Sequence, residues 1–306
     1  MNTSPDRRIL VTGASGFVGH HVARAIEEGR FGPARMLAWP KVDLRDGPAV
    51  ATAVAEAAPD AVIHLAAQSF VPRSFQDPEE TLAVNLTGTL HLLQGLKTSG
   101  FTGRLLFVSS GDVYGQVPEE ALPVVETRLP EPRNPYAVSK LAAEHLCLQF
   151  GRSEKLDTVV ARPFNHIGPG QDPRFVVPSI ARQIAQIAVQ GGRGTLDLGD
   201  IDTTRDFTDV RDVVSAYACL LESGRSGDIY QVASGVERRV RDLLESMCLL
   251  AGIEGEVRQD PARMRLAEQR RMVADTRKIR ADTGWAPQIS IETTLTDIIN
   301  EARNNQ

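Results

Sequence analysis

The chain of 306 residues contains few cysteines and no long hydrophobic run. Cys147, Cys219 and Cys248 are scattered and odd in number, and each lies among residues that favour helices. We therefore expect reduced thiols packed in helices, without a disulfide framework or a metal site. No apolar stretch approaches the roughly 20 residues of a membrane-spanning helix, and the segment before Arg8 lacks the apolar core of a signal peptide. These absences predict a soluble, cytoplasmic protein with no membrane partner.

Positive charge is not in excess either. Lys and Arg number 34 against 39 Asp and Glu, which gives a net charge of −5 and argues against a nucleic-acid partner. Hydrophobic residues make up 42% of the chain and charged residues 24%, as in ordinary globular proteins. A chain of this length buries roughly 75% of the surface that its unfolded form exposes. One large domain or two modest ones can therefore form a core without disulfides or metal.

Short apolar runs alternate with helical stretches in the first half of the chain. The pattern predicts strands over 8–12, 35–39, 61–66, 104–109 and 158–161, and helices over 17–28, 50–58, 78–96 and 136–150. Strands that are apolar on both faces and alternate with helices indicate a parallel sheet covered on both sides. The sequence thus predicts a Rossmann-type, doubly wound α/β fold.

After Pro163 the sequence becomes richer in proline, glycine and polar residues. It predicts a loop over 164–174, a helix over 178–190, a strand over 195–198, a polar loop to 205, a helix over 210–221, a strand over 228–233 and two helical stretches around the basic segment 263–271. We expect a larger lobe from 1–163 with about 205–233 returning to the sheet. Residues 164–204 and 234–306 then form a smaller C-terminal α/β lobe, with a cleft between the two.

A glycine-rich turn joins the first predicted strand to the first predicted helix. Gly13, Gly16 and Gly19 have the spacing that keeps such a turn tight and lets its amides approach a pyrophosphate. The helix N-terminus adds unpaired N–H groups and a positive dipole. A glycine triplet alone is weak evidence, but its position between strand and helix predicts a dinucleotide site.

The end of the second strand bears on which dinucleotide is bound. An acid there would hold the ribose hydroxyls of NAD, yet the first acid is Asp43. Arg35 and Lys41 could instead meet the 2′-phosphate of NADPH, or both could be solvated surface charges. NADP(H) is the preferred expectation, with NAD(H) possible.

Tyr136 and Lys140 begin a predicted helix and, being four residues apart, share one of its faces. A neighbouring ammonium favours the phenolate, which would make Tyr136 a usable proton donor and acceptor near neutral pH. Ser109 and Ser110 end the preceding strand, at the carboxyl edge where α/β sheets bind ligands. The three groups together predict a catalytic site.

These motifs resemble the extended short-chain dehydrogenase/reductase family over essentially the whole chain. Residues 64–67, Asn85 and 113–115 also match its pattern, and the segment from Arg205 to Val210 is similar to its nucleotide-sugar members. Residues 109–115, 162–171, 260–265 and 283–285 are similar to the reductases of GDP-4-keto-6-deoxymannose that form GDP-D-rhamnose, although we expect Trp285 to serve C-terminal packing.

The resemblance implies catalytic roles for Ser110, Tyr136 and Lys140, and a GDP-sugar substrate. It implies cofactor contacts at Gly13, Ser15, Gly16, Phe17, Val18, Gly19, Asp43, Leu44, Leu65, Ala66, Ala67, Tyr136 and Lys140. It implies substrate contacts at Ser110, Gly111, Asp112, Asn165, Arg205, Arg265 and Glu268. It also implies a homodimer formed through the helices at 78–96 and 136–150.

Several alternatives stay open at the level of sequence. Arg205 either clamps a diphosphate in a bidentate fork or forms a surface pair with Asp206, and His166 either touches substrate or structures its loop. Arg258, Arg270 and Arg271 most simply form a solvated face. A 4-epimerase is not excluded, and a 4,6-dehydratase would usually carry an acid pair or Ser-Glu where this chain has Gly111 and Asp112.

Overall fold

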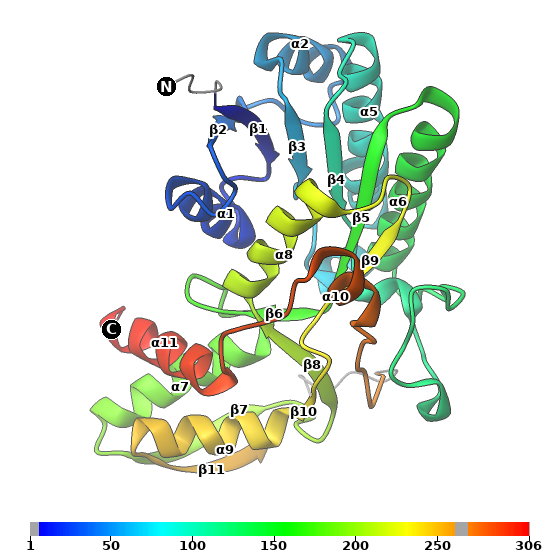
Figure 1. Cartoon of the computed structure of the whole chain (residues 1–306). Coiled ribbons are helices and arrows are strands. Elements are labelled where there is room, and N and C mark those ends of the chain that lie inside the picture. The colour runs from blue at the N-terminus through cyan, green and yellow to red at the C-terminus, as the bar shows by residue number, and fades with distance from the viewer. Residues whose placement is uncertain (1–5, 261–268, 306) are drawn as a thin grey trace.

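The computed structural model describes residues 6–260 and 269–305 (Figure 1). Its central sheet has six parallel strands in the order β2-β1-β3-β4-β5-β9. They are β1 (Arg7–Thr12), β2 (Ala34–Ala38), β3 (Ala61–His64), β4 (Arg104–Val108), β5 (Asp157–Pro163) and β9 (Ile229–Val232). The order reverses between β1 and β3, which makes the carboxyl ends of these two strands the expected dinucleotide site.

Helices cover both faces of this sheet, as Figure 1 shows. On one face, α1 (Phe17–Glu27), α8 (Val210–Ser223) and α10 (Arg277–Thr283) pack over an apolar core that includes Ile9, Val11, Ile63 and Trp285. On the other face, α2 (Gly47–Ala57), α5 (Gly88–Thr98) and α6 (Pro135–Glu154) pack over Leu10, Val62 and Leu105. Neighbouring residues of β1 thus face opposite cores, and the predicted doubly wound fold is confirmed.

The long helix predicted over 78–96 is confirmed, with one irregularity. It consists of α4 (Pro78–Leu82), a π-helical turn over Ala83–Thr87 (η1) and α5, and it is preceded by the short α3 (Val71–Gln76), which was not predicted. Asp77 caps α4, because its carboxylate accepts from the Glu80 N–H (2.9 Å). The π turn adds a residue to the helix at Asn85, whose side chain is buried and bonded to Gln68 and Ser139.

Outside the central sheet and its helices, the described residues also form two small sheets with three helices. Strands β10 (Glu237–Arg239), β8 (Thr204–Asp209) and β6 (Asn165–Ile167) form one sheet, and β11 (Glu254–Gln259) pairs with β7 (Arg193–Leu198) in the other. Helices α7 (Val176–Val189), α9 (Val240–Ala251) and α11 (Ile291–Asn304) enclose their apolar core. Two 3₁₀ turns, η2 (Gly111–Tyr114) and η3 (Glu119–Ala121), follow β4.

Several of these strands were not predicted. The expected loop over 164–174 begins with β6, the polar loop before the helix at 210 contains β8, and the tail contains β10 and β11 besides its helices. β6 and β10 have only three residues each, so pairing with β8 rather than a sequence pattern creates them. The lobe boundaries stay a prediction: β9 joins the central sheet, while β8 belongs to the small one. Within the described ranges, no helix is both long and apolar enough to cross a bilayer.

Candidate active site

The glycine turn between β1 and α1 is closed so tightly that side chains are excluded from it. Gly13 has φ +74°, and a Cβ on it would lie 2.8 Å from the Ala66 backbone nitrogen. A Cβ on Gly19 would lie 2.4 Å from the Gly13 oxygen. The Gly16 N–H donates to that same oxygen (3.0 Å). The turn therefore brings the start of α1, with its unpaired amides, to the carboxyl ends of β1 and β3, in a form that fits a pyrophosphate.

A buried hydrogen-bond chain fixes the strand ends behind this turn. The Thr89 hydroxyl donates to the Asn85 carbonyl (2.6 Å), so it accepts from Nε2 of His64 (3.0 Å). The Thr12 hydroxyl then donates to Nδ1 of His64 (2.6 Å) and accepts from the Ala66 N–H (3.2 Å). The bond in which Thr12 donates to Nδ1 needs a neutral imidazole, because a protonated ring would make Nδ1 a donor.

Burial keeps that imidazole neutral. It lowers the pKa of His64 to about 3, and the positive charge of Lys140 acts in the same direction. Sequence reasoning gave His64 and Asn85 only as parts of a family pattern. A buried polar residue at the end of an apolar strand was the signal for a structural role.

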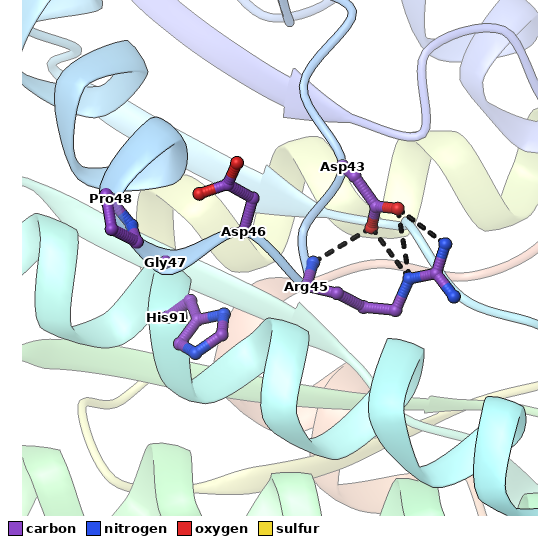
Figure 2. Close-up of a pocket in the computed structure, with 6 residues that line it drawn as sticks. All are labelled: Asp43, Arg45, Asp46, Gly47, Pro48 and His91. Atoms are coloured by element: carbon purple, nitrogen blue, oxygen red, sulfur yellow. Dashed lines mark hydrogen bonds and ion pairs between the residues drawn. The ribbon is translucent and has the colours of Figure 1, made fainter.

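Asp43 lies at one wall of a pocket of about 670 Å³ (Figure 2), which is lined by Asp43, Arg45, Asp46, Gly47, Pro48 and His91. Its carboxylate accepts three hydrogen bonds from the Arg45 guanidinium (2.6–3.0 Å) and one from the Arg45 N–H (2.9 Å). This pairing lowers the pKa of Asp43 to about 2. Leu44 is buried in the core, and its carbonyl accepts from Nδ1 of His91 (2.8 Å). A ligand at Asp43 would therefore share a carboxylate that Arg45 already holds.

Arg35 cannot meet a 2′-phosphate, and that interpretation is wrong. It pairs with Arg8 across β2 and β1 and lines a surface pocket with Asp60, which precedes β3. This pocket is at the amino ends of the strands, whereas the glycine turn is at their carboxyl ends. Lys41 follows the carboxyl end of β2 and is exposed. Of the two cations, only Lys41 is on the correct side of the sheet.

Ser110 and Tyr136 come together beyond the end of β4. Ser110 caps η2, with its Oγ accepting from the Asp112 N–H (3.2 Å). Tyr136 is the second residue of α6, after Pro135 and the cap of Asn134, whose Oδ1 accepts from the Ala137 N–H (2.7 Å). The Ser110 hydroxyl contacts the Tyr136 phenol and lowers its pKa.

The net shift of Tyr136 is nevertheless upward, which corrects the expectation that Lys140 would depress it. Burial is the largest cause that raises the pKa of the phenol, and the carboxylate of Asp112 adds to it. Lys140 is buried one helical turn further on, with Nζ 4.5 Å from the ring centroid of Phe107. Burial lowers its own pKa to about 8. At neutral pH the site therefore holds a protonated phenol near a buried cation.

Gly111 packs closely against a neighbouring ring. A Cβ there would lie 3.1 Å from two ring atoms of Phe164, which is itself buried. A larger residue at position 111 would therefore require the Phe164 ring to shift, and Asp112 is the one carboxylate of the Gly111–Asp112 pair.

The small sheet brings Asn165 and Arg205 near each other. Asn165 of β6 pairs with Phe207 of β8, two residues beyond Arg205. Arg205 donates to the Thr204 carbonyl (2.7 Å). Asp206 is fully buried and accepts from the amides of Ser234, Gly235 and Ala274, so the alternative of a surface pair between Arg205 and Asp206 is wrong.

The other predicted residues all lie in the C-terminal part of the chain. Arg265 and Glu268 lie outside the described residues. Arg258, Arg270 and Arg271 are exposed, as expected of a solvated face, and they form ion pairs there with Asp197 of β7, with Asp200, and with Glu119 of η3 and Glu237 of β10. Trp285 is buried and its Nε1 donates to Ser215 Oγ (2.8 Å), as expected of a packing residue.

A doubly wound sheet with a glycine turn, serine, tyrosine and lysine at one edge defines the class of NAD(P)-binding oxidoreductases built on this fold. The family model described as GDP-mannose 4,6 dehydratase matches residues 27–298. The chain belongs to this family, within the extended short-chain dehydrogenases/reductases.

Individual relatives agree with this assignment. The chain is 51% identical over 296 residues to GDP-6-deoxy-D-mannose reductase of Pseudomonas aeruginosa, which covers 96% of this chain and 97% of that protein. It is 31% identical over 288 residues to GDP-mannose 4,6-dehydratase of Vibrio cholerae, covering 84% and 76%. The solved structure of RMD from Pseudomonas aeruginosa complexed with NADPH has a TM-score of 0.92 at 49% identity, covering 98% of this chain and 100% of that chain.

Proposed function

We propose that this protein is an NADPH-dependent reductase of the C4 ketone of GDP-4-keto-6-deoxy-D-mannose, with GDP-D-rhamnose as product. The observation that carries the proposal is the contact of Ser110 with Tyr136, near buried Lys140, at the sheet edge that also holds the glycine turn. The 51% identity to a GDP-6-deoxy-D-mannose reductase supports the substrate.

Each catalytic side chain has a role that its environment supports. When bound at the glycine turn, a reduced dinucleotide would supply the hydride for the carbonyl carbon. Tyr136 donates its phenolic proton to the carbonyl oxygen, and its raised pKa means that the phenol carries this proton at neutral pH. Ser110 donates a hydrogen bond to the same oxygen. Lys140 contributes positive charge and a contact to the nicotinamide ribose.

NADPH is the preferred cofactor of the proposal, with NADH possible. Gly13, Gly16 and Gly19, with the first amides of α1 at Phe17 and Val18, would hold the pyrophosphate. Exposed Lys41 is suitably located for the 2′-phosphate, and the solved relative with a TM-score of 0.92 is complexed with NADPH. Other proposed cofactor contacts are Ser15, Asp43, Leu44, Leu65, Ala66 and Ala67.

The proposed substrate site uses residues from β6 and β8 of the three-stranded sheet and from η2. Arg205 clamps the diphosphate and Asn165 bonds diphosphate or sugar, which the pairing of β6 with β8 supports. Gly111 and Asp112 line the sugar beside Ser110. Two further substrate contacts are proposed from the sequence alone: Arg265 would bind a phosphate, and Glu268 would bind the guanosine ribose.

Reduction is favoured over 4,6-dehydration because of Gly111. Dehydration needs a base at C5 and a donor to expel the C6 hydroxyl, while only Asp112 of this pair carries a carboxylate. The ring of Phe164 would have to shift to admit a second acid at position 111. Ketone reduction requires only hydride, one proton donor and an anchored carbonyl.

We also propose that two copies pair through α4–α5 and α6, and that the protein acts in the cytoplasm. Val138 on α6 is 44% exposed in the single chain, as a residue at such an interface would be. Sedimentation at micromolar concentration should give a species of twice 33.3 kDa. A single-chain species under those conditions contradicts the dimer.

The substitution Tyr136→Phe tests the catalytic assignment. It removes the proton donor and keeps the ring, so kcat should fall roughly 10²–10⁴-fold. The Kd for NADPH, measured by fluorescence titration, should stay close to that of the wild type. Near-normal turnover in this variant would refute the role of Tyr136.

A further inference from the structure

The ring of Phe17, the first residue of α1, lies against the segment that follows β6. It stacks on the ring of His166, with centroids 6.1 Å apart and planes 5° from parallel, within the range of favourable aromatic contacts. A Cβ on Gly168 would lie 3.8 Å from Cζ of Phe17, and one on Gly170 would lie 3.9 Å from its Cδ2. The segment 166–170 therefore wraps around this ring.

His166 is held in this position by its own strand. Its Nδ1 donates to the Phe164 carbonyl (3.0 Å), and the Gln171 side chain donates to the His166 carbonyl (3.0 Å). Burial lowers the pKa of His166, so the ring is neutral when it stacks. This answers the open question about His166: it structures its loop and presents a fixed face to Phe17.

Two further bonds fasten the same loop to neighbouring helices. Nε2 of His21, one turn after Phe17 in α1, donates to the Pro169 carbonyl (2.9 Å). The Gly170 N–H donates to the Glu301 carboxylate of α11 (2.7 Å). The ring of His21 also meets that of Phe17 edge-on, with centroids 5.3 Å apart. The contact between α1 and the loop is thus a built interface.

The two sides of this interface lead directly to the two proposed binding sites. Phe17 follows Gly16 of the dinucleotide turn. His166 follows Asn165 and pairs with Thr208 in β8, the strand that carries Arg205. The dinucleotide turn, Phe17, His166 and the strand that carries Asn165 are therefore joined in one series of direct contacts and adjacent residues.

We propose that the stacked pair Phe17 and His166 makes binding of the dinucleotide and of the nucleotide-diphosphate substrate mutually favourable. The pyrophosphate fixes the turn and with it Phe17, and the fixed ring then orders β6 for the second ligand. Because the first ligand has already ordered these elements, the second ligand loses less conformational entropy on binding and binds more tightly. This is positive coupling between the two sites. His166 is in this account a positioning residue, acting through Phe17 rather than on the reacting atoms. The inference rests on the proposed function, since it needs both ligands.

Calorimetric titration of the full-length protein with GDP, with and without saturating NADP⁺, measures this coupling. In the wild type, NADP⁺ should tighten GDP binding by about fivefold or more. His166→Leu and Phe17→Leu should each bring that ratio close to one, and the double variant should lose no more than either single variant because both act through one contact. The ratio divides out any change in affinity for GDP alone.

Two variants serve as matched controls. His166→Phe keeps an aromatic ring against Phe17 and should retain most of the coupling. His20→Leu changes an exposed residue of the same helix and should leave the ratio unchanged. The inference is overturned if the coupling ratio of the wild type is near one. It is also overturned if both leucine variants, at positions 17 and 166, keep the full coupling. Either result leaves the reductase proposal standing. Wild-type protein that binds neither NADP⁺ nor NADPH contradicts the proposed function itself.

Discussion

At the scale of single residues, the protonation state of Lys140 should set the pH dependence of kcat. Burial lowers its pKa from 10.5 to about 8, so the ammonium is present below that pH and is lost above it. If the reaction needs this charge, kcat should fall about tenfold per pH unit above pH 8.

Lys140→Arg provides the control for this pH profile. Arginine stays protonated throughout the accessible range, so the variant, although less active, should show no alkaline decline near pH 8. An identical decline in the variant and the wild type would assign it to another group.

At the scale of elements, the buried carboxylate of Asp206 joins β8 to two other segments. It accepts from the Ser234 and Gly235 amides (2.8 and 2.9 Å) and the Ala274 amide (3.2 Å). Asp206→Ala leaves these donors without their acceptor, so we expect a loss of roughly 2–4 kcal/mol in the free energy of unfolding. Urea denaturation measures it.

Asp202→Ala is the matched comparison for Asp206→Ala. Asp202 pairs with Arg241 at the surface, where ion pairs contribute little to stability. The urea midpoint of the Asp202→Ala variant should therefore stay close to that of the wild type. Equal destabilisation by the two substitutions would contradict the anchoring role of Asp206.

A helix or strand could be predicted from the sequence where its own residues carry the apolar pattern that forms it. The strands and helices of the central sheet carry their own apolar pattern, and the predicted helix that begins at Tyr136 is α6. β6 and β10 have three residues each and β8 is mostly polar, so all three lack an apolar pattern of their own and pair with one another in the small sheet. Arg35 was misassigned because its charge was considered without its position, although the predicted strand over 35–39 already placed it at the amino end, away from the glycine turn. The upward shift of Tyr136 depends on burial, which its spacing to Lys140 does not encode.

For the whole molecule, the buried histidine behind the dinucleotide turn couples stability to pH. His64 titrates near 6.5 in an unfolded chain and at about 3 when folded. As pH falls below 6.5 the unfolded chain takes up a proton first, so this contribution to stability is present above pH 6.5 and is lost towards pH 3. Between pH 7 and pH 5 the loss should be about 2 kcal/mol.

Denaturation of the wild type and His64→Gln at both pH values isolates this contribution. Glutamine does not titrate, so the variant should lose less stability between pH 7 and pH 5 than the wild type. An equal loss in both proteins would mean that His64 is not held neutral by the fold.

The central claim is ketone reduction on a GDP-sugar, and the loss of NADPH absorbance tests it most directly. The substrate is GDP-4-keto-6-deoxymannose, made in the same vessel from GDP-mannose by a separate dehydratase, with NADH compared in parallel. The account predicts rapid oxidation of NADPH, one molecule for each GDP-D-rhamnose formed, and none without the keto sugar. Protein that binds NADPH but leaves its absorbance unchanged in the presence of this substrate would contradict the reductase and favour an epimerase or dehydratase.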